Sequence, residues 1–318
     1  MSEPRPNHDA GGAAGAGANA DARPVRIGYV RYFNTLPLVQ GLEHWRDVSL
    51  HPAAPSALGD SLLRGDVDLA LCSLVDAARA GGALTLVPAG MIGCDGHTLT
   101  VRLLSRVPMA SVSEIHADIE SHTSVVLARV LLAGMHGVRP AIIDDDVHAR
   151  AVNLLARGDS AAWPETMLMI GDKVVTDAPG EAVYPHQLDL GQAWKELTGL
   201  PFVYAMWMCR TAQSGDARIL GAARVLARQR LRNASRLEWI VERFANERKW
   251  PDDLARRYVR DLLRYAPDER AMSGAREFVR QAGDLGLLGE SSAFPPVMVL
   301  QRDAAEPMTR ALEAGTNA

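Results

Sequence analysis

The chain has 318 residues, of which 47% are hydrophobic and 23% charged, and its formal net charge at pH 7 is −4. This composition is typical of a soluble globular protein with room for two domains, and the acidic balance argues against a protein that lives on nucleic acid. The three cysteines, Cys72, Cys94 and Cys209, contain no Cys-x-x-Cys spacing. We therefore exclude a disulfide framework and expect a protein of the reducing cytoplasm.

The N-terminal segment 1–24 contains no Leu, Ile, Val or Phe. A secretory signal needs an apolar stretch, so this segment does not fit one, and its composition predicts a disordered tail. No later stretch approaches eighteen uninterrupted apolar residues. We therefore expect no membrane-spanning helix and no membrane partner.

From residue 25 onward, short apolar runs alternate with helical patterns. Runs that are apolar on both faces, each followed by a helix, indicate βαβ units with a parallel sheet, so the predicted fold class is α/β. The predicted strands are 25–30, 48–53, 67–72, 99–105, 140–144, 167–172 and 202–209. The predicted helices between them are 36–45, 55–65, 73–82, 123–134, 148–157 and 188–198.

After residue 210 the pattern predicts only helices, near 215–231, 236–248, 251–265 and 268–284. Ser235 and Glu238 fit a capping box at the start of the second of these helices. The basic residues of this region are interleaved with apolar ones at helical spacing and lack aromatic neighbours for stacking. They therefore indicate a solvated helix face rather than a nucleic-acid site. This layout predicts two α/β lobes, with the C-terminal helices packed on one of them.

The sequence contains no metal, nucleotide or serine-nucleophile motif, since GxSxG, HExxH, a P-loop and a GxGxxG after the first strand are all absent. Instead, polar residues follow four predicted strands, at 31–35, Ser73, 121–124 and 171–173. In an open α/β sheet, ligands bind at the carboxyl ends of strands, beside helix N-termini whose free N–H groups suit an anion. Helix capping explains each turn singly, but four such turns from two halves predict an anion-binding cleft between them.

The run GYVRYFNTLPLVQGL (28–42) resembles the opening of the chorismate dehydratases of the futalosine route to menaquinone, a strand that ends in Ser-Tyr-x-Asn-x-x-Pro-Leu. Further stretches are similar in order, at 62–79, 92–105, 121–132, 167–175, 189–207 and 258–288. The resemblance implies a periplasmic-binding-protein-like fold of the second type, with the ligand cleft between two lobes. The first lobe would comprise 25–100 plus 206–318, and the second 101–205.

The resemblance also implies a reaction, the loss of water from chorismate to give 3-[(1-carboxyvinyl)oxy]benzoate, without a metal or an organic cofactor. Because the product ring is aromatic, such a protein needs mainly to hold and desolvate the dianion. Asn34 matches the family's Asn and is the expected catalytic residue, although a turn-forming role would also suit it. A substrate carboxylate is our hypothesis for the proton acceptor. The expected substrate-binding residues are Arg31, Ser73, Thr100, His122, Thr123, Ser124, Gly171 and Asp172.

Two positions depart from the family pattern, because Arg31 stands in place of its Ser and His122 in place of its usual Arg. The positive charge would then lie on the other lobe, at Arg31, where it could still neutralise a substrate carboxylate. Alternatively, the two changes could indicate that the protein binds a different ligand. Asp172 fits a helix cap better than a base. Two alternatives therefore stay open, a non-catalytic cytoplasmic small-anion-binding protein of the same fold and a diverged lyase acting on a related aromatic carboxylate.

Overall fold

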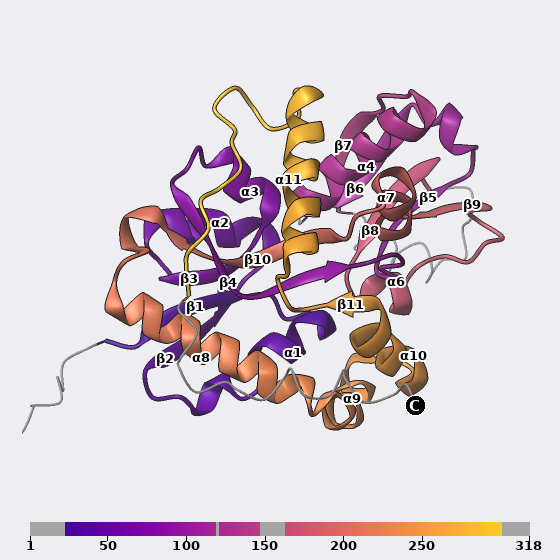
Figure 1. Ribbon diagram of the computed structural model, residues 1–318. Coiled ribbons are helices and arrows are strands. Elements are labelled where there is room, and N and C mark those ends of the chain that lie inside the picture. The colour runs from indigo at the N-terminus through magenta and orange to yellow at the C-terminus, as the bar shows by residue number, and fades with distance from the viewer. Residues whose placement is uncertain (1–22, 119–120, 147–162, 301–318) are drawn as a thin grey trace, which may run out of the picture.

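The computed structural model describes residues 23–118, 121–146 and 163–300. Within these ranges the chain forms two α/β lobes, each built around one β-sheet (Figure 1). The predicted tail 1–24, apart from its last two residues, and the predicted helix 148–157 lie outside the described residues.

The sheet of the first lobe has six strands in the order β11-β4-β10-β3-β1-β2. Its strands are β1 (Val25–Tyr29), β2 (Val48–Pro52), β3 (Leu69–Ser73), β4 (Leu84–Cys94), β10 (Phe202–Arg210) and β11 (Leu263–Arg264). β1 pairs in parallel with β2 and β3, whereas β10 runs antiparallel to β3 and β4. The prediction of a parallel sheet is therefore wrong, because the chain passes from β4 into the second lobe and returns along β10, which pairs antiparallel with β4.

The sheet of the second lobe has five strands in the order β7-β6-β8-β5-β9. Its strands are β5 (Val101–Ser105), β6 (Glu114–Asp118), β7 (Ala141–Asp145), β8 (Thr166–Ile170) and β9 (His186–Asp189). β6 is parallel to β7 and β8, but β5 is antiparallel to β8 and β9. Both sheets are thus mixed, within the predicted α/β class.

Helices cover both sheets and follow the predicted order. They are α1 (Leu36–Val39), α2 (Pro55–Arg64), α3 (Leu74–Arg79), α4 (His122–His136), α6 (Lys173–Thr176), α7 (Leu190–Thr198), α8 (Ala217–Ala234), α9 (Leu237–Phe244), α10 (Asp252–Arg257) and α11 (Glu269–Asp284). A 3₁₀ turn, η1 (Phe33–Thr35), precedes α1, and a π-helical turn, η6 (Tyr258–Leu262), follows α10. The predicted helix 36–45 ends early because Gly41 takes a left-handed φ of 96°.

The predicted capping box of Ser235 and Glu238 is wrong. Ser235 ends α8, and its hydroxyl donates to the Arg232 carbonyl at 2.8 Å, whereas the N-cap of α9 is Arg236 and has no side-chain capping hydrogen bond. The carboxylate of Glu238 instead accepts hydrogen bonds of 2.9 and 3.0 Å from Arg256 on α10. Ser235 thus contacts only the last turn of α8, while Glu238 joins α9 to α10.

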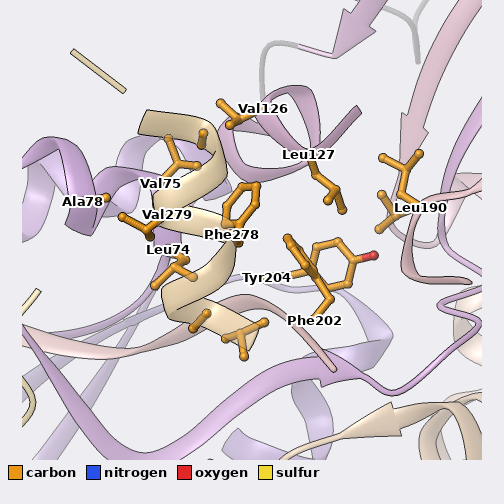
Figure 2. Close-up of a cluster of buried hydrophobic side chains, with 14 of the residues drawn as sticks. Leu74, Val75, Ala78, Val126, Leu127, Leu190, Phe202, Tyr204, Phe278 and Val279 are labelled. Atoms are coloured by element: carbon orange, nitrogen blue, oxygen red, sulfur yellow. The ribbon is translucent and has the colours of Figure 1, made fainter. Parts of the chain in front are cut away.

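One hydrophobic core extends across both lobes (Figure 2). Phe278 on α11 packs edge-on against Phe202 of β10, with ring centroids 4.9 Å apart, and also against Trp194 of α7. α11 contacts β10 and α3 as well as α4 of the second lobe. The C-terminal helices were predicted to pack on one lobe, but α11 lies against both and fixes them to each other.

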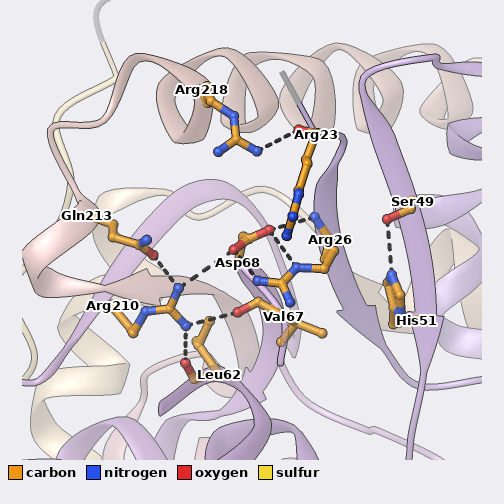
Figure 3. A network of polar contacts seen from close by, with 10 residues as sticks. All are labelled: Arg23, Arg26, Ser49, His51, Leu62, Val67, Asp68, Arg210, Gln213 and Arg218. Atoms are coloured by element: carbon orange, nitrogen blue, oxygen red, sulfur yellow. Dashed lines mark hydrogen bonds and ion pairs between the residues drawn. The ribbon is translucent and has the colours of Figure 1, made fainter. Parts of the chain in front are cut away.

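A network of polar contacts ties β1, β3 and β10 together (Figure 3). Asp68 accepts hydrogen bonds from the backbone and side chain of Arg26 at 2.9 to 3.1 Å, and Arg210 approaches the same carboxylate to 3.6 Å. Burial by itself would raise the pKa of Asp68, but the hydrogen bonds from Arg26 outweigh it and lower the pKa. These two arginines are thus engaged in holding the first sheet together.

Candidate active site

A cavity of about 700 Å³, partly open to solvent, lies between the two lobes. Hydroxyl, amide and imidazole groups line it from both lobes, at Tyr32, Asn34, Thr35, Ser73, Thr98, Thr100, Ser121, His122, Thr123, Ser124, Tyr204 and Tyr258. The remaining wall is apolar apart from backbone, and none of the described lining residues is Asp, Glu, Lys or Arg.

The structure brings most of the predicted site residues together in this cavity. The predicted residues that line it are Asn34, Ser73, Thr100, His122, Thr123, Ser124 and Gly171. Arg31 is exposed and lines a neighbouring groove, which shares Val30, Tyr32 and Pro55 with the cavity. Asp172, the residue after Gly171, does not line the cavity.

Asn34 is a lining residue with an unsatisfied polar atom. Its Oδ1 atom is buried and has no hydrogen-bond partner among the described residues. The Asn34 amide lowers the pKa of the neighbouring Tyr258 phenol, against the larger opposing effect of burial. A buried acceptor without a partner is costly, so this atom is suited to a donor group on a ligand.

The N-termini of α3 and α4 meet at the cavity, one from each lobe. Ser73 begins α3 and accepts a hydrogen bond from Asp76 N at 3.4 Å, while Ser121 begins α4 and accepts one from Ser124 N at 3.3 Å. Thr123 Oγ1 lies 2.7 Å from the Ser73 hydroxyl and so joins the two lobes. Positive helix ends supplemented by hydroxyls favour a carboxylate. Ser121 itself, and neither Thr123 nor Ser124, is the capping residue of α4.

His122 is a lining residue whose side chain can carry a positive charge. Its Nδ1 atom lies 2.6 Å from Oδ1 of Asp76 on the other lobe. This hydrogen bond raises the pKa of His122, although burial lowers it. The ion pair therefore favours the charged imidazolium at the N-terminus of α4, where a carboxylate would bind.

Asp172 links the lobes instead of capping a helix. It stands at the start of α6, yet its carboxylate accepts no hydrogen bond from that helix. Its two oxygens accept from Phe33 N, across the lobes, at 3.0 and 3.2 Å. Burial raises the pKa of Asp172 to about 6. The predicted capping role is thus wrong, and the residue instead holds the turn that carries Asn34.

Two tyrosines in the wall went unrecognised in the sequence. Tyr204 Oη lies 2.7 Å from Thr98 Oγ1, and Tyr258 Oη lies 2.6 Å from Thr100 Oγ1. Tyr204 sits within an apolar strand pattern and Tyr258 within a helical one, so neither follows a strand as the other site residues do. The local sequence offers one indication of their role, which is that each tyrosine places a hydroxyl group on an otherwise apolar face.

The segment that carries Thr98 and Thr100 is held by Asp189. Its carboxylate accepts from Thr98 N at 2.9 Å and from Leu99 N at 2.7 Å, and it also caps α7. Leu99 has a φ of 72°, a conformation that side chains other than glycine rarely adopt. Asp189 thus stabilises a strained turn that directs both threonines to their tyrosine partners.

No group of three His, Cys, Asp or Glu side chains in residues 23–118, 121–146 and 163–300 is arranged to hold a metal ion. Over the same ranges, no helix combines the length and the apolar character needed to cross a bilayer.

Sequence comparison relates the chain to proteins of quinone metabolism. A profile of the family described as "Menaquinone biosynthesis" matches residues 25–284. The chain is 27% identical over 275 residues to a chorismate dehydratase of Thermus thermophilus, and this match covers 82% of the chain and 96% of the relative.

Structural comparison identifies the fold. A protein of Archaeoglobus fulgidus is similar with a TM-score of 0.62 at 16% identity, over 84% of this chain and 99% of that one. The alkanesulfonate-binding protein SsuA of Xanthomonas axonopodis pv. citri, bound to MOPS, gives a TM-score of 0.58 at 15% identity, over 87% and 98%. A Candida albicans protein described as having the generic periplasmic binding protein fold gives 0.56 at 11% identity, over 89% and 99%.

At these identities the structural likenesses show the fold alone, and they confirm the expected periplasmic-binding-protein-like architecture. The family profile goes further, because it covers most of the chain, including both lobes and the segments that line the cavity. The chain therefore belongs to the menaquinone biosynthesis family.

Proposed function

We propose that the chain is a chorismate dehydratase, a hydro-lyase that removes water from chorismate to give 3-[(1-carboxyvinyl)oxy]benzoate on the futalosine route to menaquinone. The observation that carries this proposal is the unpartnered, buried Oδ1 atom of Asn34 in a cavity between the lobes. The family and the name of the Thermus relative support it.

The polar groups of the cavity suit a dianion with one hydroxyl group. One carboxylate would bind at the N-termini of α3 and α4, where Ser73, Thr123 and the His122 imidazolium converge. The second would lie toward the adjoining groove, where Arg31 stands. The hydroxyl would then donate to Asn34 Oδ1. The lobe boundaries that we propose, 25–100 plus 206–318 and 101–205, place this ligand between them.

The reaction breaks a C–H bond at the ether-bearing carbon and the C–O bond of the neighbouring hydroxyl. The electron pair of the C–H bond becomes the new ring double bond, the hydroxyl leaves, and it combines with the proton as water. Because no carboxylate side chain among the described residues lines the cavity, we infer that a carboxylate of the substrate takes the proton. The protein then contributes orientation through Asn34 and removal of water by the apolar wall.

The test is to incubate the purified protein with chorismate and to follow the benzoate product by chromatography and mass. Asn34→Ala is expected to abolish turnover with the fold intact, while Asn246→Ala, at an exposed asparagine, is the matched control. Product from the wild type and the control alone supports the proposal.

Two outcomes would overturn it. A rise in Tm with chorismate but no product from the wild type would indicate a non-catalytic anion-binding protein. Neither product nor a thermal shift would mean that Arg31 and His122 belong to the site of a different aromatic carboxylate.

A further inference from the structure

We propose that Asp189 is a positioning residue, whose carboxylate holds Leu99 in a left-handed conformation and so fixes the two neighbouring threonines in the wall of the cavity. Thr98 and Thr100, on either side of Leu99, line the cavity, whereas Asp189 does not. This role rests on the proposed function, because it serves the same cavity.

The conformation of Leu99 needs a cause outside the turn itself. Its φ of 72° lies in the left-handed region, which leucine avoids because its Cβ crowds the following carbonyl oxygen. Without an outside constraint the residue would rotate to a negative φ, and the peptide groups on both sides would turn with it. Thr98 and Thr100 would then lose their places in the wall, where each hydroxyl lies within 2.7 Å of a tyrosine oxygen.

One buried carboxylate supplies the constraint by accepting hydrogen bonds from four backbone N–H groups. Asp189 Oδ2 accepts from Leu99 N at 2.7 Å, and Oδ1 accepts from Thr98 N at 2.9 Å. Oδ1 also accepts, at 3.1 Å each, from Gly191 N and Gln192 N in the first turn of α7. Hydrogen bonds to an ionised acceptor are roughly twice as strong as neutral ones. The end of β9 and the start of α7 therefore fix the carboxylate, and the strained turn conforms to it.

The start of α7 is also shaped to hold the crossover segment, residues 95–100, through which the chain passes from β4 to β5. A Cβ at Gly191 would collide with the Thr98 side chain and with the backbone of the crossover segment. One turn further along α7, Lys195 Nζ lies 2.5 Å from Asp95 Oδ1. The helix thus contacts the crossover segment at several points, although these residues of α7 do not line the cavity.

Asp189→Asn disturbs this arrangement selectively. A carboxylate offers two oxygens to the four N–H groups, but an asparagine offers one oxygen and one NH₂ group. In either orientation of the amide, the NH₂ group would face backbone N–H groups, so the variant cannot hold both the helix and the turn. Leu99→Gly is the compensating change, because glycine adopts a φ of 72° without the strain that the carboxylate opposes.

The experiment compares Asp189→Asn, Leu99→Gly and the double variant in steady-state assays on chorismate. Asp216→Asn is the matched control, because Asp216 caps α8 through Arg218 N at 2.8 Å and does not contact the cavity wall. In Asp189→Asn we expect kcat to fall about 10- to 100-fold and KM to change less than about threefold, since His122 is untouched. Leu99→Gly alone and Asp216→Asn should keep the wild-type kcat within about threefold, and the double variant should recover at least about fivefold of the loss.

Two kinetic outcomes would overturn the proposal. One is an unchanged kcat in a folded Asp189→Asn variant. The other is a loss of kcat that Leu99→Gly does not recover, since the carboxylate would then act in some way other than by holding the turn. Should Asp189→Asn fail to fold, Asp189→Ser takes its place, because serine keeps a capping oxygen for α7 and is too short to reach Leu99 N.

A second readout does not depend on turnover. Asp189→Asn should lower the urea midpoint of unfolding, and the shift should be about half as large or smaller when Leu99→Gly is already present. Asp216→Asn should shift the midpoint equally in both backgrounds. If the wild type does not convert chorismate, the proposed function fails, and this comparison alone decides whether Asp189 holds the turn. Equal shifts for Asp189→Asn in the two backgrounds would overturn the proposal.

Discussion

His122 Nδ1 lies 2.6 Å from Asp76 Oδ1, and the two side chains come from opposite lobes. The hydrogen bond to Asp76 raises the pKa of His122, burial and Arg79 lower it, and Asp60 adds a small increase. A histidine whose pKa is raised by folding adds stability that is complete below its unfolded value of about 6.5 and is lost as pH rises through the folded value. We expect Tm to fall across that window, and Asp76→Asn to remove this part of the pH dependence. A wild-type profile that Asp76→Asn leaves unaltered would contradict the assignment.

The charge of His122 should also govern substrate affinity. As pH rises through the pKa of His122, we expect KM for chorismate to increase, because the imidazolium no longer faces a carboxylate. His122→Arg keeps its charge over this range and should flatten the KM profile. His136→Arg, at the exposed C-terminal end of the same helix, is the control and should keep the wild-type profile. Parallel profiles in all three proteins would exclude His122 from carboxylate binding.

Asp172 should reduce stability at neutral pH even though it holds Phe33. Its pKa is raised from 3.8 to about 6, so its ionisation costs the native state about 2 to 3 kcal/mol above pH 6 and nothing below about pH 4. Asp172→Asn keeps an acceptor for Phe33 N without the charge. We expect the variant to unfold at higher urea than the wild type at pH 7, and at a similar concentration at pH 4. Lower stability at pH 7 would show that the Phe33 contact needs the carboxylate.

Gly171 should be required for the shape of the cavity. It has a φ of 72°, and a Cβ there would lie 3.1 Å from the Tyr32 ring. Gly137, with a φ of 69° and open space around it, is the matched control. Both alanine variants should lose about 1 kcal/mol of stability from the left-handed backbone, but only Gly171→Ala should lose activity, because it displaces Tyr32. Equal activity in the two variants, measured on chorismate, would show that Tyr32 adjusts without consequence.

Gly274 should be essential for the contact of α11 with the start of β10. A Cβ at this position would lie 2.0 Å from the Pro201 carbonyl oxygen, whereas one at Gly283 on the same helix meets nothing within 4 Å. We expect Gly274→Ala to lower the free energy of unfolding by about 3 kcal/mol or more, and Gly283→Ala to raise it by about 0.5 to 1 kcal/mol. Urea denaturation measures both. A small loss in Gly274→Ala would mean that α11 shifts easily.

Much of the site was predictable because several of its residues follow strands directly. Asn34 follows β1 and Ser73 ends β3, and these two strands are parallel neighbours that end at the same edge of the sheet. Tyr204 and Tyr258 are far from these turns in the sequence, and only the return of β10 and the packing of η6 bring them to the cavity. No local sequence pattern indicates that residues so far apart along the chain lie close together in the fold.

The fold shows the same division between local and distant causes. α2 formed where predicted, because its proline start and left-handed Gly65 end are local signals. β4 was not predicted, since Pro88 and two glycines interrupt its apolar pattern. β4 forms a strand because β10 pairs along it, with two register shifts. The residues of β4 alone do not predict this pairing.

The chain leaves the first sheet at Cys94 and re-enters it at Phe202, and these two residues pair in register. In topological terms the whole second lobe is the connection of one antiparallel pair. Closing a flexible loop of that length carries a large entropic cost, but a lobe that has already folded holds its two ends close together. We therefore expect the inserted lobe to form first and the first sheet to be completed last, although four of its strands are the first to be synthesised.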